Sequence, residues 1–345
     1  MKKLTAFDVF CGCGGTTQGL REAGFRVVGG IEIDPLAAAT YRANHKHVKI
    51  WETDIRELNP KSILAELNMQ SGELDLLVGC PPCQSFSAMK RLNGGKVVRD
   101  KKSKDLVLEF LRFVESVNPK VVLIENVPGL ASDYRFSEVR RRLRSLGFVG
   151  EPVIRNAADF GVPQRRRRMV FVASRVGNIQ HSEILPASRH VVRDAIGHLP
   201  NPDQSDDPLH SCLENRSQRI MEMISLIPKD GGSRSALGKR FRLECHVKTN
   251  GFKDVYGRMA WDEVAPTITS GCVNPSKGRF LHPEQDRAIT LREAALLQSF
   301  PKDYRFSLER GKFAVALMIG NAFPPKFVEA HAIQIHQYLR NLNAG

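Results

Sequence analysis

Apolar and polar stretches alternate regularly along the first half of the chain. Short apolar runs of strand length occur at residues 4–10, 26–34, 74–80, 120–127 and 167–175. Stretches with helical spacing lie between them, at residues 16–25, 35–45, 103–119 and 135–148. Strands that alternate with helices predict an α/β fold whose doubly wound, mostly parallel sheet is covered by helices on both faces.

The pattern changes after about residue 177. The stretch to residue 261 is irregular and rich in Pro, Asp, Ser and Gly, and one amphipathic piece at 214–228 interrupts it. Helical spacing returns at 290–301 and again near the end of the chain. We therefore expect two domains, the first made of residues 1–185 with 312–345 and the second, smaller and irregular, of residues 186–311.

Composition and charge narrow the class of protein. The 345 residues are 42% hydrophobic and 26% charged, which is ordinary for a globular protein, and the formal net charge is +14. Such a basic chain favours a polyanionic partner, with nucleic acid first. No apolar run has the length of a membrane span or of a signal peptide, so we expect a cytoplasmic protein. The odd number of cysteines, seven, predicts reduced thiols.

A glycine-rich turn follows the first apolar run. Gly12 and Gly14 stand between a predicted strand and a predicted helix, where the backbone can approach a ligand closely. Glu32 ends the next strand at the spacing typical of an acidic residue that binds ribose hydroxyls. The pattern predicts a nucleoside cofactor, either a nicotinamide dinucleotide or S-adenosylmethionine.

Chemically active side chains follow other strands. Cys83 lies just beyond the run at 74–80, and Glu125 ends the run at 120–127, so both are expected at the edge that holds the glycine turn. Cys80 and Cys83 lack a second pair of ligands at metal spacing, which argues against zinc. Burial of Cys83 as a small apolar residue is the commonest alternative, but prolines precede it and polar residues follow it. Strand alternation places Arg166 and Arg168 on one side of their strand, and that pair can face the site.

Taken together, these blocks resemble the DNA cytosine carbon-5 methyltransferases over nearly the whole chain. The matching blocks occur in the family's order: "DVFCGCGG", Glu32 after "GGI", "TDI", "PPCQSFS", "ENV", "QRRRR", "RAITLREAALLQSFP" and "GNAFPP". The resemblance implies a Rossmann-like methyltransferase domain that binds S-adenosylmethionine, a smaller target recognition domain, and DNA in the cleft between them. It implies no metal.

The resemblance also implies a mechanism. The thiolate of Cys83 would add to carbon 6 of a flipped-out cytosine and so activate carbon 5 for methylation. A protonated Glu125 would neutralise the ring at nitrogen 3. Arg168, and with it Arg166, would hold the carbonyl oxygen at carbon 2.

Further residues are implied to bind the cofactor or the DNA. Ile33 stands where some members have a tryptophan that stacks on adenine, and Phe323 stands where a smaller residue is common. The implied cofactor contacts are Phe10, Gly12, Gly14, Glu32, Ile33, Asp54, Ile55, Leu106 and Asn321.

Two basic segments are expected to hold the duplex. Residues 90–104 carry seven Lys or Arg against one Asp and predict a mobile lid, and residues 229–258 carry eight against three acids and predict groove contacts. Solvated loops would be the simpler interpretation of both. The expected DNA-binding residues are Gln84, Ser87, Lys90, Arg91, Arg99, Gln164, Arg234, Lys239, Arg240 and Arg242.

Three other functions are compatible with parts of the pattern. A methyltransferase of the same fold could act on tRNA, although "PPCQSFS" and "ENVPG" are closer to the DNA enzymes. A DNA-binding regulator without catalysis would have no need of Cys83 and Glu125. A dehydrogenase would explain the glycine turn but would give neither residue a role. We expect a monomeric DNA enzyme of a prokaryote or phage that is associated with the nucleoid through DNA. A restriction endonuclease or other defence proteins are possible partners.

Overall fold

The computed structural model describes residues 3–82, 106–183, 189–211, 215–238, 241 and 254–343. The chain divides into two compact units and passes between them more than once. Unit 1 comprises residues 1–156, 167–184 and 323–345, and unit 2 comprises residues 157–166 and 185–322. The division at 184 and 185 lies a few residues beyond residue 177, after which the sequence pattern changes. Residues 157–166 and 312–322, which we expected in the first domain, group with unit 2.

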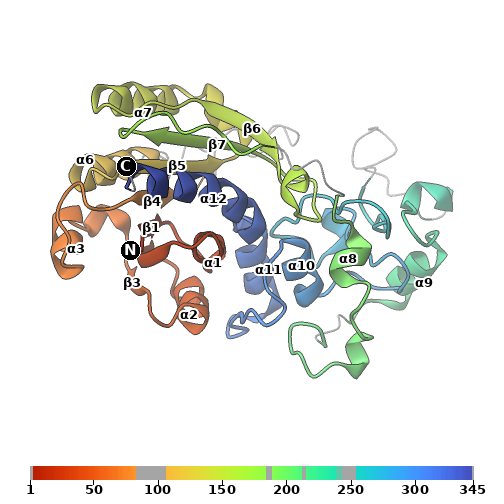
Figure 1. Cartoon of the computed structure of the whole chain (residues 1–345). Helices are drawn as coiled ribbons and strands as arrows, with labels where there is room; N and C mark the ends of the chain where they lie inside the picture. Colours follow the sequence, from red (N-terminus) through yellow and green to blue (C-terminus); the bar gives the residue numbers. More distant parts are fainter. Residues whose placement is uncertain are drawn as a thin grey trace. The chain divides into compact units, whose positions relative to one another are not determined.

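Within its described residues, unit 1 holds a seven-stranded sheet with the order β3-β2-β1-β4-β5-β7-β6 (Figure 1). The strands from β3 to β5 in this order are parallel, whereas β7 runs antiparallel to both β5 and β6. The doubly wound, mostly parallel sheet predicted from the sequence is therefore confirmed. The strands are β1 (Thr5–Val9), β2 (Arg26–Glu32), β3 (Lys49–Glu52), β4 (Leu76–Gly79), β5 (Val121–Asn126), β6 (Pro152–Asn156) and β7 (Arg167–Ser174).

Helices cover the sheet on both faces, with α6 and α7 on one face and α12 on the other (Figure 1). In α7 the buried residues Phe136, Val139 and Leu143 recur at helical spacing, which gives an otherwise very polar helix one apolar face. The helices of unit 1 are α1 (Gly15–Glu22), α2 (Pro35–Asn44), α3 (Pro60–Glu66), α6 (Leu106–Val117), α7 (Tyr134–Ser145) and α12 (Pro325–Leu342).

A large apolar core of unit 1 lies between the sheet and the helices α3, α6 and α7. Phe7 of β1, Phe110 of α6, Phe136 of α7 and Phe171 of β7 are among its buried members. Because the strands carry apolar residues on consecutive positions, both faces of the central strands are buried. Polar side chains can then gather at the edge of the sheet formed by the carboxyl ends of the parallel strands.

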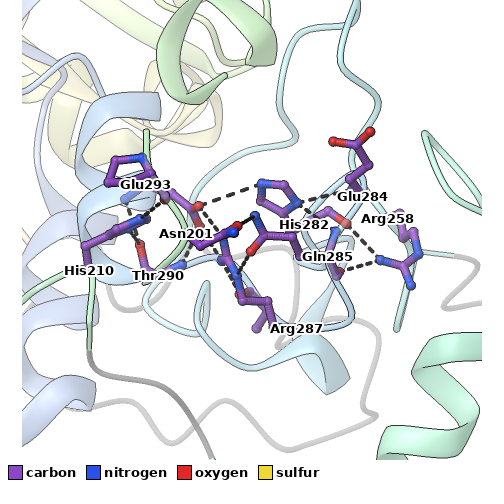
Figure 2. Close-up of polar contacts among 11 residues, drawn as sticks. Asn201, His210, Arg258, His282, Glu284, Gln285, Arg287, Thr290 and Glu293 are labelled. Atoms are coloured by element: carbon purple, nitrogen blue, oxygen red, sulfur yellow. Dashed lines mark hydrogen bonds and ion pairs between the residues drawn. The ribbon is translucent and has the colours of Figure 1, made fainter. Parts of the chain in front are cut away.

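Unit 2 has four α-helices and no named β-strand among its described residues. Irregular backbone must satisfy its polar groups by other means, and buried side chains do this. Arg258, which is fully buried, donates to the carbonyl oxygens of Ile224 and Ile227. It also donates to those of His282 and Gln285 (Figure 2). The helices are α8 (Val192–Ile196), α9 (Gln218–Leu226), α10 (Leu291–Leu297) and α11 (Gly311–Asn321). No helix in the described parts of the chain is long and apolar enough to cross a membrane.

Candidate active site

The turn after β1 has an unusual backbone. Phe10, Gly12 and Gly14 adopt φ angles of 67°, 54° and 98°, so the turn passes through the left-handed region three times before α1 begins. A non-glycine residue there costs roughly 1–3 kcal/mol, which the packing of Phe10 against the apolar core offsets. A side chain added at Gly12 would meet no atom of the described part of the chain within 4 Å. The turn therefore leaves open space beside its backbone.

Glu32 ends β2 next to this turn, and backbone amides hold its carboxylate. One oxygen accepts from the amide of Gly12 at 2.9 Å, and the other accepts from Ile33 at 2.9 Å and Asp34 at 2.8 Å. Burial raises the pKa of Glu32, and these amides partly offset the effect. Ile33 beside it keeps 61% of its surface exposed, although it is a large apolar residue. The end of β2 thus presents a carboxylate next to an apolar surface.

Three polar residues that the sequence analysis did not single out form a hydrogen-bonded group next to the glycine turn. The hydroxyl of Thr17 donates to Asp8 at 2.8 Å and lies 2.9 Å from the hydroxyl of Tyr41. Burial, with a smaller contribution from Glu32, raises the pKa of Asp8 to about 7. Its second oxygen, Oδ1, is buried and has no hydrogen-bond partner among the described residues.

His45 holds the end of the turn. Its Nε2 donates to the carbonyl oxygen of Gly14 at 3.2 Å, and its Nδ1 accepts from Arg21 at 3.1 Å. Burial lowers the pKa of His45 to about 4, so the ring is neutral at pH 7. The sequence gave no sign of this role, because the role depends on a contact with a turn 31 residues earlier in the chain.

Glu125 and Arg168 form an ion pair at the same edge of the sheet. Glu125 is the penultimate residue of β5 and Arg168 lies at the beginning of the antiparallel β7, so their side chains meet, with 3.0 Å between Arg168 Nε and Glu125 Oε1. Both are largely buried. The neighbouring Asn126 donates to the carbonyl oxygen of Pro81 at 2.8 Å, which ties the end of β5 to the segment after β4.

Cys80 directly follows β4 and lies beside this pair. Gly79 is in register with Ile124, so Cys80 and Glu125 follow on neighbouring strands, and the Cys80 sulfur lies 3.9 Å from the hydroxyl of Thr16 in α1. Since β1, β4 and β5 are adjacent and parallel, the glycine turn, Cys80 and Glu125 share one edge of unit 1. This is the edge predicted from the strand ends.

Arg166 and Gln164 have internal positions in unit 2. The two terminal nitrogens of Arg166 donate to the carbonyl oxygens of Ile268, Gly320 and Ala322 at 3.1–3.2 Å. Gln164, which we expected at the DNA, is fully buried and bonds Gln298 and the amide of Ile268 instead. Burial alternates along the arginine run as predicted, with Arg165 and Arg167 exposed and Arg166 buried.

The remaining described candidates have varied surroundings. Asp54 precedes the short 3₁₀ helix η1 (Ile55–Glu57), and its ion pair with Arg56 lowers its pKa. Ile55 is buried in the apolar core of unit 1. Leu106, at the beginning of α6, packs against the same core. In unit 2, Asn321 ends α11 with an exposed side chain, and the guanidinium group of Arg234 lies over the ring of Tyr256.

Several expected site residues lie outside the described residues. They are Cys83, Gln84, Ser87, Lys90, Arg91, Arg99, Lys239, Arg240 and Arg242, together with the rest of the segment 90–104. In the parts of the chain that the structure describes, no group of three or more His, Cys, Asp or Glu side chains gathers as a metal site would require.

Comparison with known proteins gives matches over the whole of this architecture. The family model for C-5 cytosine-specific DNA methylases matches residues 4–337. The type II methylase M.HgiDII of Herpetosiphon aurantiacus is 36% identical over 97% of this chain and 96% of its own length. The type II methyltransferase M1.HphI of Haemophilus parahaemolyticus is 34% identical over 95% of this chain and 86% of its own. These matches confirm the resemblance seen in the sequence.

Solved structures share the fold. A prophage-encoded Escherichia coli protein named as a DNA modification methyltransferase has a TM-score of 0.76 at 22% identity and covers 98% of this chain and 100% of that chain. The Dnmt2 methyltransferase of Schizosaccharomyces pombe has a TM-score of 0.58 at 20% identity over 99% of this chain and 100% of that chain. At these identities the likeness concerns the fold alone.

Proposed function

The chain belongs to the family of C-5 cytosine-specific DNA methylases, and from this premise we propose how its residues methylate cytosine in duplex DNA. The enzyme is a DNA (cytosine-5) methyltransferase. We propose S-adenosylmethionine as the methyl donor, Cys83 as the nucleophile, and a target cytosine that is flipped out of the helix. The observation that carries the proposal is the buried pair of Glu125 and Arg168 at the edge that also bears the glycine turn.

The residues around the glycine turn fit a nucleoside donor. Gly12 leaves open space beside the backbone, the Glu32 carboxylate can accept from ribose hydroxyls, and the exposed side chain of Ile33 offers an apolar surface to adenine. When bound, S-adenosylmethionine supplies a methyl group attached to a sulfonium sulfur. After transfer of the methyl group, the rest of the donor leaves as a neutral thioether. The turn and Glu32 would hold and orient this donor.

In the proposed reaction, the thiolate of Cys83 forms a bond to carbon 6 of cytosine. The electron pair of the double bond between carbons 5 and 6 moves into the ring, where a proton from Glu125 at nitrogen 3 neutralises it. Carbon 5 then takes the methyl group. A base removes the proton from carbon 5, the bond between Cys83 and carbon 6 breaks to release the thiolate and restore the ring, and the proton at nitrogen 3 returns to Glu125. The thiol cannot reach carbon 6 in a stacked duplex, which requires base flipping.

Arg168 is the residue that we propose holds the carbonyl oxygen at carbon 2. A guanidinium beside a carboxyl group can serve two neighbouring positions of the cytosine edge, nitrogen 3 and oxygen 2, at the same time. The guanidinium of Arg166 is occupied by main-chain carbonyl oxygens in unit 2, so we assign Arg166 to positioning that segment.

The experiment that tests the proposal is transfer of labelled methyl from S-adenosylmethionine to duplex DNA, followed by bisulfite sequencing. We expect label in cytosines of one short sequence and none with Cys83→Ser or with Glu125→Gln at comparable enzyme concentration. Full activity of Cys83→Ser would overturn the mechanism. Label in tRNA but not in DNA, from a parallel reaction, would overturn the choice of substrate.

We also propose that the methylation protects DNA against a cognate endonuclease, because relatives with the highest identities reported above are named type II methylase or methyltransferase. Plasmid DNA from cells that express the enzyme should resist an endonuclease of the specificity found by bisulfite sequencing. Plasmid from cells that express Cys83→Ser should be cut. Equal cutting of both plasmids would contradict this role.

A further inference from the structure

The glycine turn is held on two sides by different elements. On the side of β2, the amides of Cys11 and Gly12 donate to residues at the end of that strand. On the side of α2 the contact comes from a side chain, since Nε2 of the buried His45 lies 3.2 Å from the carbonyl oxygen of Gly14. A glycine has no side chain that restricts its own backbone, so contacts of this kind determine the conformation of the turn.

Gly14 is the position at which the turn becomes the helix α1. Its φ angle is 98°, and its carbonyl oxygen accepts from the amide of Gln18 at 2.9 Å as the first bond of the helix. The ring of His45 approaches the same oxygen, which has a second lone pair to offer. The peptide group between Gly14 and Gly15 is therefore held from two directions.

The two partners of His45 determine which ring nitrogen carries the proton. A carbonyl oxygen can only accept, so Nε2, which faces Gly14, is the protonated nitrogen. A guanidinium group can only donate, so Nδ1, which lies 3.1 Å from Arg21, is the acceptor. Burial, and then the charge of Arg21, lower the pKa of His45 to about 4, in agreement with a neutral ring. The ring also packs against Tyr41 of α2, with 4.8 Å between the ring centroids.

We infer that His45 is a positioning residue for the methyl donor: its neutral ring holds the Gly14 carbonyl and keeps the glycine turn in the conformation that binds S-adenosylmethionine. The inference rests on the donor site proposed above. His45 acts through the turn and not on the cytosine. Its loss should therefore lower the affinity for the donor and leave the transfer of methyl from bound donor nearly unchanged.

Substitutions at His45 separate its two nitrogens from its ring. His45→Phe keeps a ring against Tyr41 but removes both nitrogens, and we expect the Kd for S-adenosylmethionine, measured by calorimetry, to rise about tenfold. The KM for the donor should rise with it, whereas kcat at saturating donor should stay within about twofold of the wild type. His45→Gln offers an amide donor to Gly14 and a carbonyl acceptor to Arg21, so it should restore most of the affinity.

His210→Phe is the matched control. His210 is also buried, its Nε2 lies 2.9 Å from the carbonyl oxygen of Pro200, and it belongs to unit 2. This variant should lose stability in urea and keep the Kd of the wild type for the donor. In protein without donor, the amide of Gln18 should exchange with solvent faster in His45→Phe than in His210→Phe.

Three results would overturn the positioning role. The first is wild-type donor affinity in His45→Phe, and the second is an equal loss of affinity in His45→Phe and His210→Phe. The third is a His45→Gln protein that binds the donor as weakly as His45→Phe, because the hydrogen bonds would then not be the cause. A wild-type protein that does not bind S-adenosylmethionine would overturn the donor site and this inference with it. One that binds the donor but methylates no DNA would overturn the proposed function alone.

Discussion

Arg166 and Arg168 are two positions apart in the chain, yet their surroundings differ. Arg168 pairs with Glu125 in unit 1, and Arg166 bonds main-chain carbonyl oxygens in unit 2. We expect Arg168→Ala to lower kcat by roughly 10²–10³-fold, the usual loss for one donor that stabilises developing charge. Single-turnover methylation rates at saturating DNA would measure this.

Arg166→Met is expected to act on stability. It leaves buried carbonyl oxygens without their charged donor, which should lower the free energy of unfolding by about 3 kcal/mol. Urea denaturation followed by circular dichroism would measure the change, with Arg165→Met, at an exposed position of the same run, as control. Equal stability of the two variants would contradict the assignment.

Asp8 should make stability depend on pH. Its pKa rises from 3.8 to about 7 in the folded chain because the carboxyl group is buried. The folded state therefore keeps a proton that the unfolded state has lost, so this contribution is complete below about pH 4 and disappears as the pH rises through 7. The difference between the two pKa values corresponds to a contribution to the free energy of unfolding of at most about 4 kcal/mol.

Asp8→Asn cannot ionise, so this part of the pH dependence should vanish. Between pH 5 and pH 8 the free energy of unfolding should fall more steeply for the wild type than for the variant. Urea denaturation at four pH values would measure both slopes. Parallel curves would show that Asp8 is already ionised in the folded protein at pH 5.

Sequence reasoning found the residues that follow strand ends and missed those that support them. Glu32 and Glu125 could be placed because their positions follow from where an apolar run stops. Asp8 and His45 could not, because their roles depend on partners from other elements, such as Thr17 and the Gly14 carbonyl. A buried polar residue inside an apolar run, as Asp8 is, was the one signal available in the sequence.

Among the elements, α1 and α12 are packed so closely that one position has no room for a side chain. A Cβ at Gly19 would lie 2.6 Å from the Cβ of Val328 and would also meet the main chain at Pro325. We expect Gly19→Ala to force the helices apart and to lower the free energy of unfolding by about 1–3 kcal/mol. Because α1 begins at the glycine turn, binding of S-adenosylmethionine should weaken as well. Thermal unfolding and calorimetry would measure the two effects, and an unchanged melting temperature would contradict the close packing.

In unit 2, α10 begins with a capping box that is tied to a buried ion pair. Thr290 accepts from the amide of Glu293, the Glu293 carboxylate accepts from the amide of Thr290, and Arg287 pairs with both of its oxygens at 2.7 Å (Figure 2). Thr290→Ala should cost about 1 kcal/mol as a lost cap. Glu293→Gln should cost more, about 3 kcal/mol, because Arg287 then stays buried without its counter-charge. Urea denaturation would rank the two, and the reverse order would contradict the importance of the ion pair.

Element prediction failed where tertiary pairing, and not local pattern, determines the structure. The four residues of β3 and the five of β6 carry no sustained apolar run, and they are strands because β2 and β7 pair with them. The short α8 likewise has only five residues. The long periodic helices α6 and α7 were predicted, because each repeats its apolar positions over three turns.

At the scale of the whole molecule, the net charge of +14 should dominate the affinity for DNA. If the enzyme neutralises 6–10 phosphates, affinity should fall by roughly 10³–10⁵-fold between 50 and 200 mM salt. Binding of S-adenosylmethionine should change far less over the same range. Fluorescence anisotropy with a labelled duplex would measure the slope, and a slope near zero would contradict phosphate contacts as the main source of affinity.

The division of the chain into units also sets an order of events during synthesis. Unit 1 contains α12, which packs on α1 near the other end of the chain, and residues 185–322 of unit 2 are made between them. About 300 residues separate the end of α1 from the beginning of α12, so at roughly 5–20 residues per second this interval lasts tens of seconds, during which the face of α1 that α12 will cover has no partner. A ribosome that stops within unit 2 would therefore release a chain whose first helix has an open face, and such a fragment would be a target for chaperones and proteases.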